Sequence, residues 1–225
     1  MSAIEDSQTK FDSSYQQEDA HVDSIISPYR VRLDSSMNEV LVYAAKDMLK
    51  AKPESSLGNL LADACKLMAE EYSAEKVDFA ILNYGGIRVP SINQGPVSLG
   101  NVYELMPFDN YLVLLRLNGA KVEELMHLIA KAGGWPISGL SFEMDGDKAS
   151  HIQVAGMPLD YEKQYTLAIS DYLANGGDNL ELLVAFEQEN TNVLLREAFI
   201  AYFKKIAAEG KMLDANLENR ITKHE

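Results

Sequence analysis

Basic residues are scarce in this 225-residue sequence, and the shortage narrows what the chain can bind. There are 20 lysines and arginines against 34 aspartates and glutamates, which gives a formal net charge of −14 at pH 7. Binding to DNA or RNA depends on clustered cations, so this balance argues against a nucleic-acid partner. It disfavours binding to anionic membranes for the same reason.

Cysteines and long apolar runs are also nearly missing. Cys65 is the only cysteine, so an internal disulfide and a cysteine-based zinc site are both excluded. Its place among apolar residues at helical spacing predicts a buried, inert thiol. No run of about 18 apolar residues occurs, so we expect no transmembrane segment. The first ten residues are polar and do not form a signal peptide.

What remains is the composition of an ordinary globular domain. Apolar residues make up 47% and charged residues 24% of the chain, a mix typical of folded proteins. Residues 1–18 are rich in Ser, Gln, Asp and Glu, and we interpret them as a loosely ordered N-terminal arm. No repeat or linker divides the rest, so residues 19–225 are predicted to form one domain.

The order of the predicted elements favours an α+β fold, in which mixed β-sheets are flanked by helices. The second half groups its strands together, whereas a strictly alternating parallel fold would intersperse them with helices. Pro28 should break or kink the first helix. The predicted helices are 21–36, 57–72, 99–105, 122–132 and 193–208, and the predicted strands are 40–45, 77–83, 111–117, 140–144, 151–154, 165–170 and a short one at 180–184.

Groups that would carry catalysis are not evident. The four histidines, His21, His127, His151 and His224, are scattered, and none lies in an H-E-x-x-H pattern. Asp19-Ala-His21 formally matches the D-x-H pairing of some metal sites, but no buried strand precedes it and we interpret the match as chance. His127 falls inside a predicted helix, where a structural or solvated role is favoured. We therefore predict no catalytic residue and no metal ligand in this chain.

Three segments at predicted element ends could bind a ligand. In Asn83-Tyr-Gly-Gly-Ile-Arg88, adjacent glycines let backbone amides approach a ligand, and Arg88 could hold a phosphate or carboxylate. Phe108 lies in a turn, where it could plug the core or stack on a ring. Tyr172 could also stack, and Asp178 could accept hydrogen bonds from a ring or a sugar. Each signal alone is weak. For the first segment a tight turn with a surface arginine is favoured, and for Phe108 a core plug is the default. An edge aromatic with a turn-forming aspartate is the structural alternative for the third segment.

Taken together, the three segments resemble the C-terminal domain of 5′-nucleotidases. The pattern is Asn-x-Gly-Gly-Ile-Arg at 83–88, Leu-Met-Pro-Phe-Asp-Asn at 105–110 and Asp-Tyr-Leu-Ala-Asn-Gly-Gly-Asp at 171–178, in that order. Glu54–Asp63 and Ile137–Leu140 extend the resemblance, which covers more than half of the chain. In this family an N-terminal metallophosphatase domain holds two divalent metals, and the C-terminal domain binds the nucleotide.

The resemblance implies a role for each matching residue. Asn83 and Arg88 would hold the phosphate nearest the ribose, and Phe108 and Tyr172 would sandwich the base. Asp178 would bind the ribose hydroxyls. Stacking of this kind is worth roughly 1–3 kcal/mol per base.

The chain departs from the family pattern at three points. It carries no metallophosphatase domain, so divalent metals are expected on a separate metallophosphatase chain and no cofactor in this one. Lys50 and Lys52 stand where arginines usually grip phosphate, and lysine lacks their bidentate geometry. Tyr84 replaces a small residue and could crowd its loop. With so few local cations, we expect weak phosphate capture by this chain alone.

The resulting functional hypothesis is the nucleotide-binding half of a split 5′-nucleotidase-like phosphohydrolase, converting a nucleoside monophosphate to nucleoside and phosphate. Two alternatives stay open: a non-catalytic nucleotide- or nucleoside-binding module, and a degenerate domain that kept the fold without the ligand. Members of the family are usually exported, so the resemblance implies a periplasmic or extracellular location, and a cytoplasmic one stays open.

Overall fold

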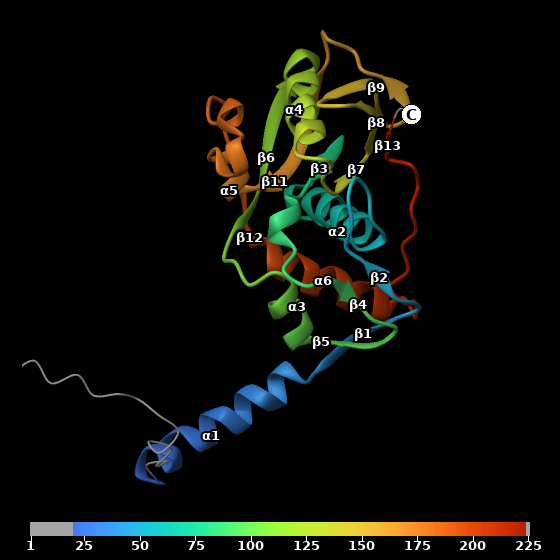
Figure 1. Cartoon of the computed structure of the whole chain (residues 1–225). Coiled ribbons are helices and arrows are strands. Elements are labelled where there is room, and N and C mark those ends of the chain that lie inside the picture. Colours follow the sequence, from blue (N-terminus) through green and yellow to red (C-terminus); the bar gives the residue numbers. More distant parts are fainter. Residues whose placement is uncertain (1–19, 224–225) are drawn as a thin grey trace, which may run out of the picture.

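The computed structural model describes residues 20–223 and is built around a five-stranded sheet (Figure 1). The strands lie in the order β12–β6–β11–β3–β7. β11 runs parallel to β3 and antiparallel to β6, so the sheet is mixed. This confirms the predicted α+β class with mixed sheets and flanking helices. The five strands are β3 (Phe79–Ile81), β6 (Tyr111–Asn118), β7 (Ile137–Ser138), β11 (Gln164–Ser170) and β12 (Glu189–Leu194).

Both faces of this sheet are buried, and each contributes to a different hydrophobic core. On β6, Leu112 and Leu114 belong to one core, whereas Val113, Leu115 and Leu117 belong to the other. Successive side chains of a strand point to opposite faces. A strand covered on both faces therefore has a nearly continuous apolar run instead of strict alternation, as β6 does.

Helices cover the two faces of the sheet. Residues of α2 (Ser56–Ser73) and α6 (Leu195–Ala208) belong to the first core, and residues of α4 (Gly119–Lys131) to the second. α2 is capped by the Ser55 hydroxyl, which accepts a hydrogen bond from the amide of Gly58 at 3.0 Å. The Asn118 side chain caps α4 in the same way, by accepting a hydrogen bond from the amide of Lys121, so β6 leads directly into α4.

Smaller elements complete the fold. A four-stranded sheet of order β10–β9–β8–β13 contributes to the second core, and β1–β5 and β2–β4 form two-stranded sheets. α1 extends away from the rest of the chain in Figure 1. These elements are α1 (Ala20–Met37), β1 (Val40–Ala44), β2 (Met48–Leu49), β4 (Ser91–Ile92), β5 (Gly95–Ser98), α3 (Leu99–Leu105), β8 (Leu140–Asp145), β9 (Lys148–Val154), β10 (Met157–Pro158), α5 (Asp171–Ala174) and β13 (Ile221–Lys223), with 3₁₀ turns η2 (Tyr84–Gly86), η3 (Gly177–Asn179) and η4 (Glu181–Leu183).

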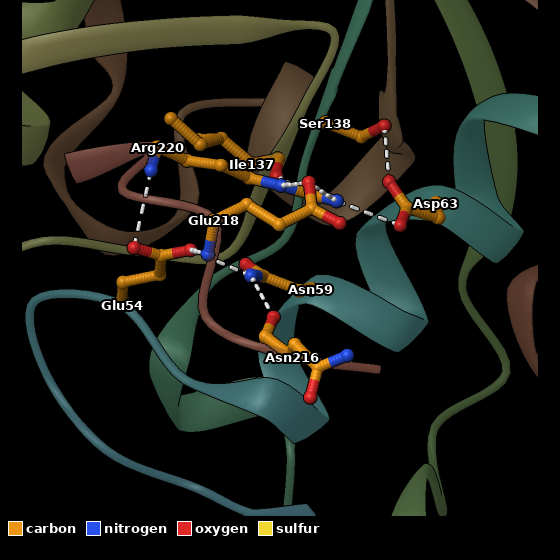
Figure 2. Close-up of polar contacts among 8 residues, drawn as sticks. All are labelled: Glu54, Asn59, Asp63, Ile137, Ser138, Asn216, Glu218 and Arg220. Atoms are coloured by element: carbon orange, nitrogen blue, oxygen red, sulfur yellow. Dashed lines mark hydrogen bonds and ion pairs between the residues drawn. The ribbon is translucent and has the colours of Figure 1, made fainter. Parts of the chain in front are cut away.

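The segment between α6 and β13 is fixed to α2 by a cluster of polar contacts (Figure 2). The Arg220 guanidinium donates to the Ile137 carbonyl at 2.7 Å and forms ion pairs with Asp63 at 2.7 Å and Glu218 at 2.8 Å. The Glu54 carboxylate accepts hydrogen bonds from the amides of Glu218 and Arg220. Two stretches that carry the family resemblance, Glu54–Asp63 and Ile137–Leu140, thus meet at the C-terminal segment.

One predicted feature of secondary structure is wrong. The strand expected at 180–184 contains the 3₁₀ turn η4, and Leu180 just before this turn and Leu183 within it are buried at a helical spacing of three residues. The helix expected to break or kink at Pro28 is not broken there, because the loss of one amide donor is tolerated within a helix of 18 residues. β12 was not predicted, because its sequence is mostly polar and it lies at a sheet edge.

Two further predictions concern the N-terminal arm and the absence of a transmembrane segment. The arm expected at residues 1–18 lies outside the described residues. Across residues 20–223, no helix is long and apolar enough to cross a membrane.

Candidate functional site

Three neighbouring strands of the central sheet bring the predicted site segments together. β3 and β11 are parallel, so the segments that follow them leave the sheet at the same end of the strands. β6 is antiparallel to β11, with Leu112 opposite Ser170, so the loop that precedes β6 lies at that end as well. The three ligand-binding segments predicted from the sequence lie in these three loops.

A cavity of about 270 Å³ opens among these loops. All five residues predicted to bind the ligand line it, and of the described residues in its lining only Arg88 and Asp178 are charged. Asn110 is a lining residue that the sequence did not single out, although it ends one of the quoted motifs. The lining consists of Asn83, Gly85, Gly86, Arg88, Phe108, Asn110, Tyr172 and Asp178.

The loop after β3 turns sharply through η2. The amide of Gly86 donates to the Asn83 carbonyl at 3.1 Å. A Cβ atom at Gly86 would lie 2.5 Å from the Asn83 side-chain oxygen, so any larger residue there would displace the Asn83 side chain. The preceding residue, Gly85, is exposed and lines the cavity, and its carbonyl accepts a hydrogen bond from the Arg88 guanidinium at 3.2 Å.

Arg88 and Phe108 lie on adjoining walls of the cavity. The guanidinium carbon of Arg88 is 5.6 Å from the centre of the Phe108 ring, which is close enough for a weak cation–π contact. Both side chains are exposed. A charged donor and an aromatic face are therefore available side by side to a ligand that carries both a ring and an anionic group.

Tyr172, Asp178 and Asn83 form a second group of lining residues, linked to one another by hydrogen bonds. The Asp178 carboxylate accepts a hydrogen bond from the Tyr172 hydroxyl at 3.0 Å and another from the side-chain amide of Asn83 at 2.6 Å. The bond to Asp178 raises the pKa of Tyr172. A Cβ at Gly177 would lie 2.5 Å from the Tyr172 ring, so the close packing of that turn requires a glycine. Asn83 thus contacts the acid predicted to bind ribose.

The two lysines ahead of α2 gather around Tyr84, next to the Arg88 loop. The ammonium groups of Lys50 and Lys52 lie 4.0 and 4.9 Å from the centre of the Tyr84 ring. Partial burial, followed by the charges of Arg88 and Lys52, lowers the pKa of Lys50. Tyr84 is not among the residues that line the cavity. Its ring thus contacts two cations beside the loop that lines the cavity.

Two residues that the sequence assigned to structural roles lie away from the cavity. Cys65 is fully buried in α2, and this burial raises the pKa of its thiol to about 12, which keeps it protonated and unreactive. The Nδ1 atom of His127 accepts a hydrogen bond from the amide of Ala149 at 3.0 Å, so this side chain links α4 to β9.

Comparison with known proteins identifies the family. The family model described as "5′-nucleotidase, C-terminal domain" matches residues 40–185. The chain belongs to this family. Its match spans the cavity and every residue that lines it.

The relatives of this 5′-nucleotidase C-terminal domain are longer proteins. Cell wall protein Lmo0130 of Listeria monocytogenes is 30% identical over 230 residues, which cover 89% of this chain and 29% of the relative. Protein UshA of Yersinia enterocolitica is 28% identical, over 83% of this chain and 38% of its own. A solved structure described as a 5′-nucleotidase precursor from Thermus thermophilus matches with a TM-score of 0.75 and 30% identity, over 92% of this chain and 43% of its own. The chain thus spans less than half the length of each.

Proposed function

We propose that this domain is the nucleotide-binding half of a 5′-nucleotidase-like phosphohydrolase. In this proposal it binds a nucleoside 5′-monophosphate and presents it to a separate metallophosphatase, which supplies the divalent metals and the activated water. The observation that carries the proposal is the convergence of Phe108, Tyr172, Arg88 and Asp178 on one cavity. Every one of these side chains offers binding chemistry for one part of a nucleotide.

The division of labour follows from the chemistry of each group. Two aromatic side chains, Phe108 and Tyr172, offer faces on which a base can stack. Asp178 offers acceptor oxygens to ribose hydroxyls, while Arg88 offers charged donors to a phosphate. The described lining contains no histidine, serine or cysteine, so we assign binding and orientation to this domain and the hydrolytic step to the metallophosphatase.

Electrostatics also favour two components. The chain has a net charge of −14. Of the described residues that line the cavity, Arg88 is the one cation, and Lys50 and Lys52 lie beside the Arg88 loop. A nucleotide would therefore be held mainly by stacking here, and metals on the metallophosphatase would balance its phosphate charge. An exported location belongs to the same proposal, and the name of the Listeria relative, a cell wall protein, supports it.

Calorimetry with adenosine 5′-monophosphate, adenosine and inorganic phosphate tests the binding half of the proposal. We expect adenosine 5′-monophosphate and adenosine to bind, and inorganic phosphate alone to bind far more weakly. Phe108→Ala should weaken adenosine binding by about 5- to 100-fold, the equivalent of one stacked base. Tyr161→Ala, at an exposed aromatic outside the cavity lining, is the matched control and should leave affinity unchanged.

Phosphate release from adenosine 5′-monophosphate tests the hydrolytic half. We expect the domain to be inactive alone, active with a metallophosphatase chain and a divalent metal, and inactive again with a chelator. Full activity of the lone chain in the presence of chelator would overturn the proposal. Nucleotide binding without any gain in hydrolysis would favour the second candidate, a nucleotide-binding module, which the same cavity also supports.

A further inference from the structure

Arg196 is a buried arginine that contacts the cavity wall from behind. It lies in the first turn of α6, and only 7% of its surface is exposed. It is not among the residues that line the cavity. Burying a guanidinium costs a large amount of hydration free energy, so its partners indicate what its position achieves.

Those partners all belong to the loop that carries Phe108. The guanidinium donates to the carbonyl of Met106 at 3.3 Å and to the carbonyl of Phe108 itself at 3.2 Å. It also donates to the Asp109 carboxylate at 2.5 Å. Two of these bonds hold the backbone at Met106 and Phe108, and the third holds the side chain of the residue that follows Phe108, so one rigid, planar group fixes the loop around this ring.

Neighbouring contacts keep both the guanidinium and the loop in place. The Tyr103 ring centre lies 4.4 Å from the guanidinium carbon of Arg196, and the amide of Leu195 donates to the carbonyl of Asn110 at 2.8 Å. One oxygen of Asp171 accepts hydrogen bonds from the amides of Tyr111 and Tyr172. The end of the Phe108 loop is thereby linked to the helix that carries the second aromatic.

The hydrogen bonding of Arg196 is incomplete. Its Nε atom is buried and has no hydrogen-bond partner among the described residues. An unsatisfied buried donor is costly, and such violations are expected where function competes with stability. The guanidinium is placed so that its terminal nitrogens bond to the loop, and its Nε is left without a hydrogen bond.

We propose that Arg196 is a positioning residue for nucleotide binding, which fixes the 106–110 loop so that the Phe108 ring stays at the correct separation from Tyr172 to enclose a base. This inference rests on the proposed function for its ligand. The structural part of the inference does not depend on a ligand, because Arg196 would fix the conformation of the Phe108 loop in the free chain as well.

A double-mutant cycle for adenosine 5′-monophosphate binding tests the inference. We expect Arg196→Met to weaken affinity by about 3- to 20-fold, a part of what complete loss of a stacked base would cost. In the Phe108→Ala background, the same change should have less than a twofold effect, because Arg196 acts through that ring. Arg196→Lys, which keeps the charge and can reach some of the acceptors, should be intermediate.

The control and a spectroscopic measurement separate this inference from the proposed function. Arg220→Met removes a second buried arginine that has no contact with the loop, and its affinity should equal that of the wild type at a temperature where both are folded. With Phe108→Trp in a Trp135→Phe background, Arg196→Met should red-shift the emission and lower the anisotropy without any ligand, and Arg220→Met should not.

Each outcome has one meaning. Additive effects of Arg196→Met and Phe108→Ala, or an unchanged reporter signal, overturn the positioning role even if nucleotide binds. A wild-type chain that binds neither adenosine 5′-monophosphate nor adenosine overturns the proposed function. In that case the reporter alone decides whether Arg196 orders the loop.

Discussion

Two arginines of the described chain, Arg220 and Arg196, are buried to a similar degree, with 9% and 7% of their surface exposed. Arg220 donates to one backbone carbonyl and forms two ion pairs, and Arg196 donates to two carbonyls and forms one ion pair. Arg220 uses its Nε and both terminal nitrogens, bonding to Glu218, Ile137 and Asp63 (Figure 2). Arg196 leaves its Nε without a partner among the described residues. The two arginines are therefore similarly buried but differ in how many of their guanidinium nitrogens form hydrogen bonds.

The two arginines also differ in what they join. Arg220 connects α2, β7 and the C-terminal segment, which are parts of the folded body. Arg196 connects α6 to one surface loop, and its acidic partner, Asp109, has a side chain that is 77% exposed, against 41% for Asp63. The comparison suggests that a fully satisfied buried arginine contributes chiefly to stability, whereas an incompletely satisfied one contributes to the geometry of the cavity.

Replacement of Arg220 should give the largest change in stability. Arg220→Met leaves the Ile137 carbonyl without the guanidinium donor, and of the two donors to the Asp63 carboxylate it leaves the Ser138 hydroxyl. We expect the free energy of unfolding to fall by about 3 kcal/mol, because a buried carbonyl and a partly buried carboxylate both lose hydrogen bonds from a charged donor. Urea denaturation measures the change. A loss below about 1 kcal/mol, the size of an ordinary substitution, would contradict the stabilising role.

Glu54 tests whether the same cluster depends on its acceptors as well as on its arginine. Its carboxylate accepts three hydrogen bonds, from the Asn59 side chain and from two backbone amides of the C-terminal segment. Glu54→Ala should lower the free energy of unfolding by about 2 kcal/mol because these donors lose their partner. Glu187→Ala, at an exposed carboxylate outside the cluster, is the matched control for urea denaturation.

The double variant of Glu54 and Arg220 sharpens this result. Because the Arg220 amide donates to Glu54, the two substitutions act on one network and should destabilise the chain by less than the sum of their separate effects. Strict additivity would show that the C-terminal segment is held by independent contacts, and the contrast with the single-loop role of Arg196 would weaken.

Much of the site could be predicted because its parts are local in the sequence. Asn83 and Phe108 lie in loops beside strongly apolar strands, and Tyr172 lies in the short helix that directly follows another one. The ends of such strands can be identified from hydrophobic patterning. Their convergence required the strand order β6–β11–β3, which local patterns do not specify. The family resemblance, not the periodicity, supplied the expectation that they form one site.

The features that were missed depend on contacts between distant parts of the chain. Arg196 is 88 residues from Phe108, and an arginine in the first turn of a helix gives no sign that it is buried. β12 is polar and pairs only with β6 at the sheet edge, so its strand depends on the partner and not on its own composition. The turn at Leu180 was mistaken for a strand because a short apolar run fits both structures.

Arg196→Met should destabilise the chain less than Arg220→Met. The Asp109 carboxylate is exposed and can be hydrated, and the orphaned Nε disappears with the guanidinium. We expect a loss of about 1 kcal/mol, close to the net value of one or two hydrogen bonds. Urea denaturation of both variants in parallel makes the comparison. A loss equal to that of Arg220→Met would show that Arg196 is a second stabilising residue of the core, and the distinction between the two arginines would fail.

Tyr172→Phe should have the smallest effect on stability, because it removes a single exposed hydrogen bond to Asp178. We expect a change below about 0.5 kcal/mol at neutral pH. The bond raises the pKa of Tyr172, so its contribution is complete below the pKa of an unfolded tyrosine, about 10, and is lost as pH rises through the higher pKa of the folded state.

Absorbance titration of tyrosinate measures this directly, as the difference between the wild type and Tyr172→Phe. The difference curve should have its midpoint above the ordinary tyrosine range, and Asp178→Asn should lower that midpoint because the phenol then loses its anionic acceptor. A midpoint at the ordinary value would mean that Tyr172 and Asp178 do not form this contact in solution. Asp178 would then be held by Asn83 alone, and the Tyr172 ring would lack the tether that keeps it opposite the loop fixed by Arg196.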